Sequence, residues 1–242
     1  MTMITGKNVL ITGANRGIGL ALLEEALRRG ARQVYAGSRE PVSHPDERVI
    51  PLRLDVTDAD QLEQAVQRVP TLDVLVNNAG VALYDDLSDR AMLERHFAVN
   101  LFGLYGVTQA FLPLLVRSRG AIVNNLAVAA LAPLPVIPAY SVSKAAAFSL
   151  TQAQRMLLAD QGVSVHAALT GPTDTDMSRE YDAPKASPES VARAIYDGVE
   201  NGEEEIFPDA MSQTLAAGWA SGPAKALERV FGGVATAEPA HS

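Results

Sequence analysis

The sequence predicts an α/β fold in which a doubly wound parallel sheet of seven strands carries helices on both faces. The main observation is an alternation between short β-branched or apolar runs and longer segments whose apolar residues recur every three or four positions. This alternation is typical of repeated strand–helix–strand units, whose parallel strands are covered on both sides. Because the crossovers in such units are right-handed, the strands are expected to form one doubly wound sheet.

Seven short runs are expected to form the strands, because each is rich in the residues that favour a buried strand. In chain order they are Asn8–Ile11, Gln33–Ala36, Val49–Leu54, Val74–Val76, Ala121–Asn124, Val163–Ala168 and Glu205–Phe207. The segments between them have helical spacing. The expected helices are Ile18–Arg29, Ala59–Arg68, Asp89–Val116, Ala139–Asp160 and Pro188–Glu200, with Met211–Val230 as one terminal helix. No repeat or low-complexity linker divides the chain, so residues 1–242 are expected to form one domain with a frayed tail over residues 232–242.

The composition narrows the class of partner. The 242 residues and the 48% apolar content fit one soluble domain with a full core. The net charge is −8 and the basic residues are scattered, so neither nucleic acid nor a membrane surface is an expected partner. The chain has no cysteine and its four histidines lie far apart, so no metal centre is expected. The first residues lead straight into a strand candidate and no apolar run reaches about 18 residues, which favours a cytoplasmic location.

The first chemical motif lies between the first strand and the first helix. It reads Thr-Gly-Ala-Asn-Arg-Gly-Ile-Gly over residues 12–19. Glycines permit a tight turn and a close backbone approach, so the free N–H groups at the helix start can bind a pyrophosphate. In this strand–turn–helix position the motif predicts a Rossmann-type dinucleotide site. The residues expected to contribute are Gly13, Asn15, Arg16, Gly17, Ile18 and Gly19.

The end of the second strand indicates which dinucleotide binds. A protein that prefers NAD offers a carboxylate to the adenosine ribose at this point, whereas here the turn holds Ser38 and Arg39. Arg16 can reach the same side, and two guanidinium groups are forked donors suited to a 2′-phosphate. The sequence therefore predicts NADP(H) as the cofactor. The alternative is that both arginines are solvated surface residues.

A second motif, Tyr-x-x-x-Lys, places Tyr140 and Lys144 in the helix expected over Ala139–Asp160. Four residues are about one helical turn, so the phenol and the ammonium share a face. A phenol with a pKa of about 10 exchanges protons poorly near neutrality, and Lys144 is expected to lower the pKa of Tyr140 and to reach the cofactor ribose. Tyr140 would then protonate a carbonyl oxygen while hydride reaches the carbon. Such a pair also occurs by chance on amphipathic helices, and the presence of the glycine motif is what favours a catalytic role for it.

These motifs resemble, in type and in order, those of the classical short-chain dehydrogenase/reductase family, from the glycine motif through Met177. Besides the motifs above, the resemblance rests on Asp55-Val56, Asn77-Asn78-Ala79-Gly80, Asn100 and the pair Gly171 and Thr175. It implies an oxidoreductase in which Asp55 contacts the adenine ring beside Val56, and in which Asn78, Ala79 and Gly80 form the turn after the fourth strand. It also implies that the segment of Gly171, Thr173 and Thr175 fixes the nicotinamide carboxamide. The alternative for Asp55 is a cap on the next helix.

The resemblance further implies that Asn100 bends its helix locally and binds a water leading from Lys144 toward solvent. A buried asparagine would need hydrogen-bond partners in any case. The alternative is an ordinary polar residue on the helix surface.

Ala127 departs from the family pattern. The family places a serine hydroxyl at this position, thirteen residues before Tyr140, and alanine has no hydrogen-bond donor there. Losing one preorganised donor costs about 10²–10³ in rate. Ser141, Ser143 and Asn125 lie nearby in the sequence, but none is evidently aimed to replace it. Three explanations stay open: an engineered knockout, a natural enzyme with a weaker hold on the substrate oxygen, or a catalytically silent NADP-binding protein acting as a sensor or scaffold.

The expected partner is a small, largely apolar ketone or secondary alcohol. The proline-stiffened segment 128–139 carries Leu131, Leu134, Val136 and Ile137 and leads into Tyr140, while residues 178–187 are expected to close over the site as a lid. The helices over Asp89–Val116 and Ala139–Asp160 are apolar on more than one face, which predicts a homodimer or homotetramer. Burial of the same faces inside one chain is the alternative.

Overall fold

The computed structural model of the protein describes residues 3–180 and 182–232. At its centre lies one sheet of seven strands, all parallel, in the order β3-β2-β1-β4-β5-β6-β7. The strands are β1 (Asn8–Thr12), β2 (Gln33–Ser38), β3 (Val49–Arg53), β4 (Val74–Asn77), β5 (Ala121–Asn125), β6 (Ser164–Ala168) and β7 (Glu205–Ile206). The order changes direction between β1 and β4, so the predicted doubly wound, single-domain fold is confirmed.

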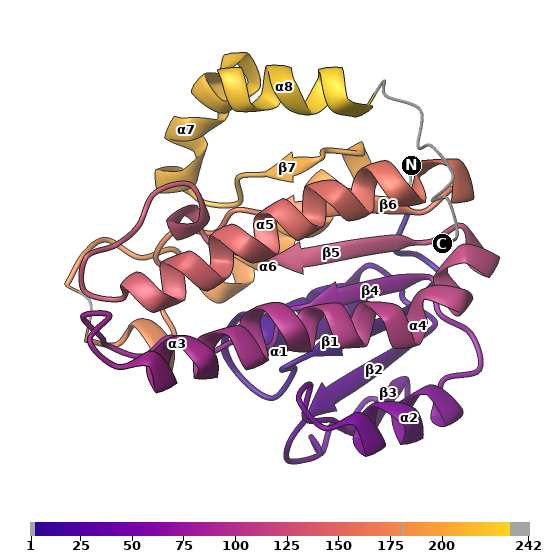
Figure 1. Ribbon diagram of the computed structural model, residues 1–242. Helices are drawn as coiled ribbons and strands as arrows, with labels where there is room; N and C mark the ends of the chain where they lie inside the picture. The colour runs from indigo at the N-terminus through magenta and orange to yellow at the C-terminus, as the bar shows by residue number, and fades with distance from the viewer. Residues whose placement is uncertain (1–2, 181, 233–242) are drawn as a thin grey trace, which may run out of the picture.

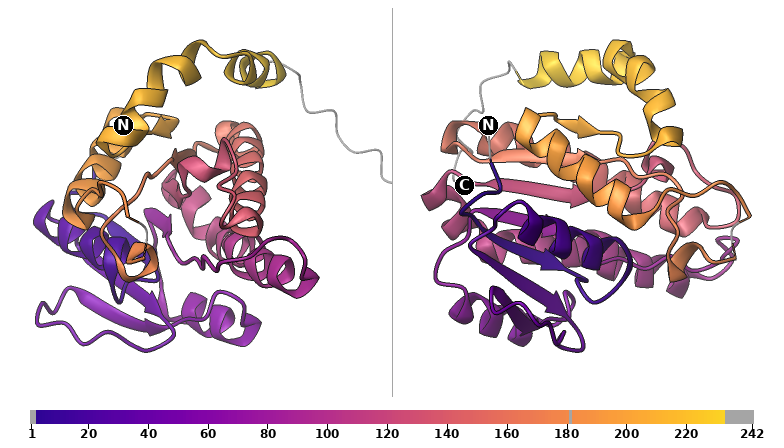
Figure 2. Two further views of the ribbon diagram at one scale, coloured as in Figure 1. Left: turned by 90° about the vertical axis from the view of Figure 1, so that its left-hand side faces the viewer. Right: turned by 180° about the vertical axis from the view of Figure 1, so that it is seen from behind.

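Helices cover both faces of the sheet (Figures 1 and 2). One face carries α1 (Gly17–Arg28) and α6 (Pro188–Asn201), which pack on each other. The other carries α2 (Ala59–Arg68), α4 (Leu104–Ser118) and α5 (Pro138–Leu158). Successive residues of a strand point to opposite faces, so Val9 and Ile11 join the α1–α6 side of the core and Leu10 joins the α2–α4 side. Both faces are thus buried, as the uniformly apolar strands require.

The long helix predicted over Asp89–Val116 is divided into three parts. Asp89 caps α3 (Arg90–Phe97), a π-helical segment η1 (Ala98–Gly103) follows, and α4 continues to Ser118. The stretch Arg90–Ser118 is long and apolar enough to span a membrane by length and composition alone. It packs along β4 and α5 as a helix of the core layer.

The single terminal helix predicted over Met211–Val230 is wrong, because the chain forms α7 (Ala210–Ser221) and α8 (Pro223–Gly232). The break falls at Gly222, whose backbone is extended, and at Pro223, which lacks an N–H and suits only the first turn of a new helix. Gly232, predicted to begin the tail, ends α8, and residues 233–242 lie outside the described residues.

A cluster of charged side chains fastens α8 to the sheet. Lys225 of α8 is 5% exposed and lies 2.9 Å from carboxylate oxygens of both Glu205 and Glu228. Arg155 of α5 lies 2.8 Å from Glu205 and is also paired with Glu228. Burying these charges is tolerable because each carboxylate has a cationic partner.

Candidate active site

The loops that carry the predicted site residues follow the carboxyl ends of the parallel strands β1 to β6, which lie at one edge of the sheet (Figure 1). Parallel strands end at the same edge, so the loops that follow them meet there although they lie far apart in the sequence. The site is therefore built from the turns after β1, β2, β3 and β4, the segment after β5 with the start of α5, and the segment after β6, with Asn100 contributed by η1.

The glycine motif has the backbone that its sequence predicts. Gly13 and Gly17 have positive φ values of 67° and 54°, a region that favours glycine. A Cβ on Gly19 would lie 2.0 Å from the carbonyl oxygen of Gly13, so no larger residue fits there. Arg16 stands at the cap position of α1, and its side chain accepts no hydrogen bond from the first N–H groups of this helix. Those donors and the positive end of the helix dipole suit a phosphate.

The other residues of the motif divide between the surface and the core. Asn15 is exposed, whereas Ile18 is partly buried against the α1–α6 core. The Arg16 guanidinium lies 3.1 Å from the Asp176 carboxylate, and both side chains are exposed.

A single hydroxyl joins the glycine motif to the turn after β4. Thr12 Oγ1 accepts hydrogen bonds from the backbone N–H groups of Asn78 and Ala79, both at 3.0 Å. The Asn78 amide returns the contact by donating to the carbonyl oxygens of Thr12 and Gly13 at 3.0 and 3.3 Å. The two loops expected to contact the cofactor are thus held as one unit. The sequence motif includes Thr12 but gives no sign of this linking role.

The turn after β2 lies beside the glycine motif, because Ala14 N donates to Gly37 O at 3.1 Å. Arg39 is exposed, as a phosphate contact requires. Ser38 is buried, and its hydroxyl donates to the carbonyl oxygen of Glu40. The arginines are therefore better placed than Ser38 to meet a 2′-phosphate.

Asp55 does not cap α2, because that role belongs to Asp58, whose carboxylate accepts from Gln61 N at 3.1 Å. Asp55 instead accepts from the N–H and the hydroxyl of Thr57 at 3.0 and 2.7 Å. Its contact with adenine stays a prediction. Val56 is buried against Gly103, where a Cβ would lie 2.6 Å from the Val56 side chain.

Tyr140 and Lys144 lie in the first two turns of α5. Lys144 Nζ donates to the carbonyl oxygen of Asn125 at 3.0 Å and lies 5.7 Å from the centre of the Tyr140 ring. A Cβ added to Gly80 would lie 3.7 Å from the same nitrogen, so the turn after β4 closes over Lys144. Lys144 is 5% exposed, whereas Tyr140 is partly exposed and remains open to a substrate.

Burial acts on both groups of this pair. It lowers the pKa of Lys144 to about 8, because the ammonium loses water. It raises the pKa of Tyr140 for the same reason, since the phenolate loses water as well. The pKa of Tyr140 therefore lies above its ordinary value, opposite to the net direction expected from the sequence, and burial is the cause.

Asn100 lies in the π-helical segment, which is the local distortion that the resemblance implies, and it is buried. Its amide clamps Val81, accepting from Val81 N and donating to Val81 O, both at 2.9 Å. It also donates to Ser143 Oγ at 2.9 Å, and Ser143 donates to the carbonyl oxygen of Tyr140 at 2.6 Å. Asn100 is thus no surface residue, and the water it is expected to bind stays a prediction.

Ala127 lies in extended backbone just beyond β5, whose last residue, Asn125, accepts the hydrogen bond from Lys144 Nζ at its carbonyl oxygen. None of the three neighbouring candidates replaces the missing donor. The Ser141 hydroxyl donates to Ile137 O, the Ser143 hydroxyl to Tyr140 O, and the Asn125 amide to Asn78 Oδ1. Each of these donors already has a partner within the protein.

The segment after β6 is anchored by Asp209, a residue that the sequence motifs do not identify. Gly171 N donates to the Asp209 carboxylate at 2.7 Å, and a Cβ on Gly171 would lie 2.4 Å from that group. Asp209 also caps α7 through Ser212 N at 2.9 Å. An acid just after a short strand candidate, followed three residues later by serine, is a capping pattern that could have been recognised.

Thr173 and Thr175 follow Gly171 on the same segment. The Thr173 hydroxyl donates to Gly171 O at 3.2 Å, and the Thr175 methyl group would lie 3.1 Å from a Cβ on Gly17. The segment after β6 therefore crosses over the glycine motif. Thr173 pairs with Ala186, which ties the far end of the expected lid to the segment that precedes the lid. Residue 181 of that lid lies outside the described residues, and its closure stays a prediction.

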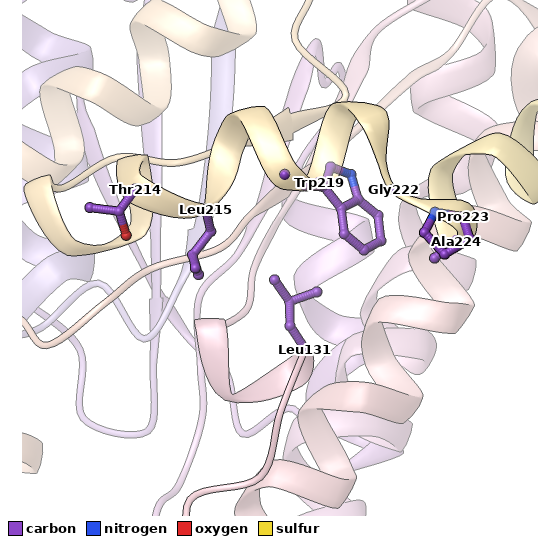
Figure 3. Close-up of a pocket in the computed structure, with 8 residues that line it drawn as sticks. Leu131, Thr214, Leu215, Trp219, Gly222, Pro223 and Ala224 are labelled. Carbon is purple, nitrogen blue, oxygen red and sulfur yellow. The ribbon is translucent and has the colours of Figure 1, made fainter.

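An apolar groove of about 380 Å³ lies between the segment after β5 and the α7–α8 pair (Figure 3). Leu131 points toward Leu215 and Trp219 across it. Leu131 is four residues beyond Ala127 on the same segment. Leu131, one residue of the predicted apolar wall, thus faces an apolar surface of α7.

Comparison with known proteins agrees with this geometry. A family model described as short chain dehydrogenase matches residues 7–186, which span the sheet from β1 to β6 and the segment after it. This chain belongs to the short-chain dehydrogenase family. It is an oxidoreductase by that membership, as its motifs implied.

Three similar proteins illustrate the range of the family. The chain is 31% identical over 230 residues to the ketoacyl reductase HetN of Nostoc sp., covering 86% of this chain and 80% of that protein. It is 32% identical over 203 residues to 2-(S)-hydroxypropyl-CoM dehydrogenase 3 of Xanthobacter autotrophicus, covering 77% and 80%. A short chain dehydrogenase from Burkholderia cenocepacia, solved in complex with NADP, is 37% identical with a TM-score of 0.85, covering 95% of this chain and 99% of that one.

Proposed function

We propose that this short-chain dehydrogenase is an NADP(H)-dependent carbonyl reductase or alcohol dehydrogenase. Its substrate is a largely apolar ketone or secondary alcohol, and its activity is limited by Ala127. The observation that carries the proposal is the convergence of an uncapped helix start, the glycine motif and the Tyr140–Lys144 pair at one edge of the sheet. NADP in the Burkholderia cenocepacia structure supports the choice of cofactor.

The residues present fit this cofactor. The free N–H groups of α1 would hold the pyrophosphate, Arg16 and Arg39 the 2′-phosphate, and Asp55 the adenine. Arg16 would exchange its exposed pair with Asp176 for the phosphate, which costs little because surface ion pairs are weak. The segment from Gly171 to Thr175 would hold the nicotinamide carboxamide.

NADPH would supply the hydride. Tyr140 donates its phenolic proton to the carbonyl oxygen, and its raised pKa suits a group that is a neutral donor at pH 7. Lys144, mostly protonated at that pH, holds the strand end at Asn125 O and stabilises the phenolate that remains. Asn100 and Ser143 fix the backbone of this helical turn. In the reverse direction the Tyr140 phenolate would take the proton of the alcohol, and the raised pKa disfavours that ionised form near pH 7.

The apolar groove beside Leu131 supports an apolar substrate, because its walls offer no charge to a phosphorylated sugar. Exposed apolar residues on η1 and α5, among them Phe102 at 62% and Leu157 at 60%, support self-association as a homodimer or homotetramer. We propose no nucleic-acid or membrane partner, and a cytoplasmic location.

The test compares NADPH oxidation by the unmodified protein and its Ala127→Ser variant across a panel of apolar ketones, with Tyr140→Phe as the inactive control. The serine is expected to raise the rate by about 10²–10³. NADPH binding, followed by fluorescence, is expected to be equal in all three proteins. Turnover by neither protein, with NADPH bound by both, would favour a second candidate that Ala127 itself suggests, a catalytically silent NADP-binding sensor or scaffold.

A further inference from the structure

The loop over residues 81–88, which joins the turn after β4 to α3, is fastened to the catalytic helix; we call it the strap. Asn100 holds its first residue, Val81, through two hydrogen bonds. Near its middle, Asp85 accepts from Ala139 N at 3.2 Å, next to Tyr140 in the sequence. Ile137, at the cap position of α5, offers this helix no side-chain acceptor, so the strap supplies one.

His96 makes the third attachment of the strap. It lies in the last turn of α3 and is completely buried. Leu83 N donates to its Nε2 at 3.0 Å, and its Nδ1 lies 2.8 Å from the carbonyl oxygen of Met92. A carbonyl only accepts and a backbone N–H only donates, so the partners require a neutral ring with its proton on Nδ1. Both nitrogens are thereby satisfied and the ring cannot rotate without losing both bonds.

The immobilised ring of His96 meets Tyr140 edge to face. Their ring centres are 6.4 Å apart and the planes are inclined at 69°. This geometry is favourable for an aromatic pair. The ring of Tyr140 thus has two close neighbours, the ammonium of Lys144 on its own helix and the imidazole of His96 on α3. The Tyr-x-x-x-Lys motif does not predict the contact between Tyr140 and His96.

We propose that His96 is a positioning residue for Tyr140, and that its neutral imidazole sets the direction of the phenol and ties it to the strap. Only the catalytic part of this proposal rests on the proposed function. Its structural part concerns two side chains and can be measured without any substrate.

The structural part is tested by NMR on the full chain. In protein labelled with ¹⁵N-histidine at pH 7, His96 is expected to show a protonated Nδ1 and an unprotonated Nε2. In protein labelled with ¹³C-tyrosine, where Tyr140→Phe identifies the Tyr140 signal, His96→Leu is expected to shift that signal more than any other tyrosine. His96→Phe, which keeps an aromatic edge but loses both hydrogen bonds, is expected to shift it less. His44→Gln, a histidine change between β2 and β3, is the control and leaves it unchanged.

A His96 ring that is doubly protonated, or protonated on Nε2, would overturn the proposal even if no variant folds. So would an unmoved Tyr140 signal in folded His96→Leu. The catalytic part is then measured in the Ala127→Ser background. There His96→Leu is expected to lower kcat at least tenfold, because a small misplacement of a reacting group can lower the rate about 10²-fold. The NADPH affinity is expected to stay within about twofold of that of Ala127→Ser alone. A loss of NADPH affinity as large as the loss of kcat would refute this part. No turnover by Ala127→Ser itself would count against the proposed function and leave the NMR result standing.

Discussion

The buried ammonium of Lys144 should make the protein more stable as the pH rises from about 8 to 10. Burial lowers its pKa from 10.5 to about 8 in the folded chain, and unfolding restores the ordinary value. Between these two values the unfolded state carries a proton that the folded state lacks, so unfolding takes up a proton. Raising the pH therefore disfavours unfolding. Below about pH 8 both states are protonated and the folded protein bears the full cost of the buried charge.

The size of the effect follows from the gap between the two pKa values. At about 1.4 kcal/mol for each pH unit, the gap corresponds to roughly 3 kcal/mol. Lys144 is 5% exposed, so solvent screening removes little of this. Replacing it with methionine removes the charge but leaves Asn125 O without its donor, which costs about 1–3 kcal/mol. The gain in stability of Lys144→Met at pH 7 is therefore smaller, at about 0–2 kcal/mol.

The assay is urea unfolding of the unmodified protein and of Lys144→Met at pH 7, 8, 9 and 10, followed by circular dichroism. Other lysines and tyrosines titrate in this range in both proteins, so the difference between the two curves isolates Lys144. Above pH 8, the free energy of unfolding of the unmodified protein is expected to rise, relative to that of Lys144→Met, by roughly 1 kcal/mol for each pH unit. A constant difference from pH 7 to 10 would refute the reasoning.

Three further substitutions probe the cofactor site. Gly19→Ala is expected to abolish NADPH binding in fluorescence titrations and to destabilise the fold by about 1–3 kcal/mol, because its Cβ would meet Gly13 O at 2.0 Å. Gly218→Ala, in an open stretch of α7, is the control and should stabilise by about 0.5–1 kcal/mol. Asp209→Ala should lower the melting temperature, because the lost helix cap is worth about 1 kcal/mol, and it should also weaken NADPH binding. Asp209→Asn should retain most of the stability and most of the binding. Equal NADPH binding by the unmodified protein and these two variants would contradict the anchoring of Gly171 by Asp209. Arg39→Ala should weaken NADPH binding about tenfold, because a charge-assisted contact is lost, and should leave NADH binding unchanged. An equal loss of affinity for both nucleotides would count against a contact between Arg39 and the 2′-phosphate.

The sequence was sufficient to predict the fold because the information is local. Strand and helix periodicity predicted all seven strands and placed α2 at Ala59–Arg68 without error. It missed the break at Gly222-Pro223, where the apolar spacing continues from α7 into α8 although the backbone does not.

The candidate site was predictable as a set of residues but not as a set of contacts. The motifs identify the glycine loop, Tyr140 and Lys144, which the structure brings to one edge of the sheet. They do not identify Asp209 or His96, whose partners are backbone groups 38 and 13 residues away. The direction of the Tyr140 pKa was also wrong, because a motif shows the neighbouring charge and not the loss of water around it.

The π-helical segment alters the winding of the helix that follows it. From His96 to Leu115 a regular α-helix makes about 5.3 turns, which would carry Leu115 roughly 100° away from the side that holds His96. Both residues are nevertheless buried, as are Asn100, Leu104, Val107 and Phe111 between them. The wider turn of Ala98–Gly103 takes up the difference and keeps a row of residues spaced mostly by four on one side. Deleting one residue here would rotate the whole of α4 about its axis, turning Phe111 and Leu115 out of the core while the active-site motifs remained intact in the sequence.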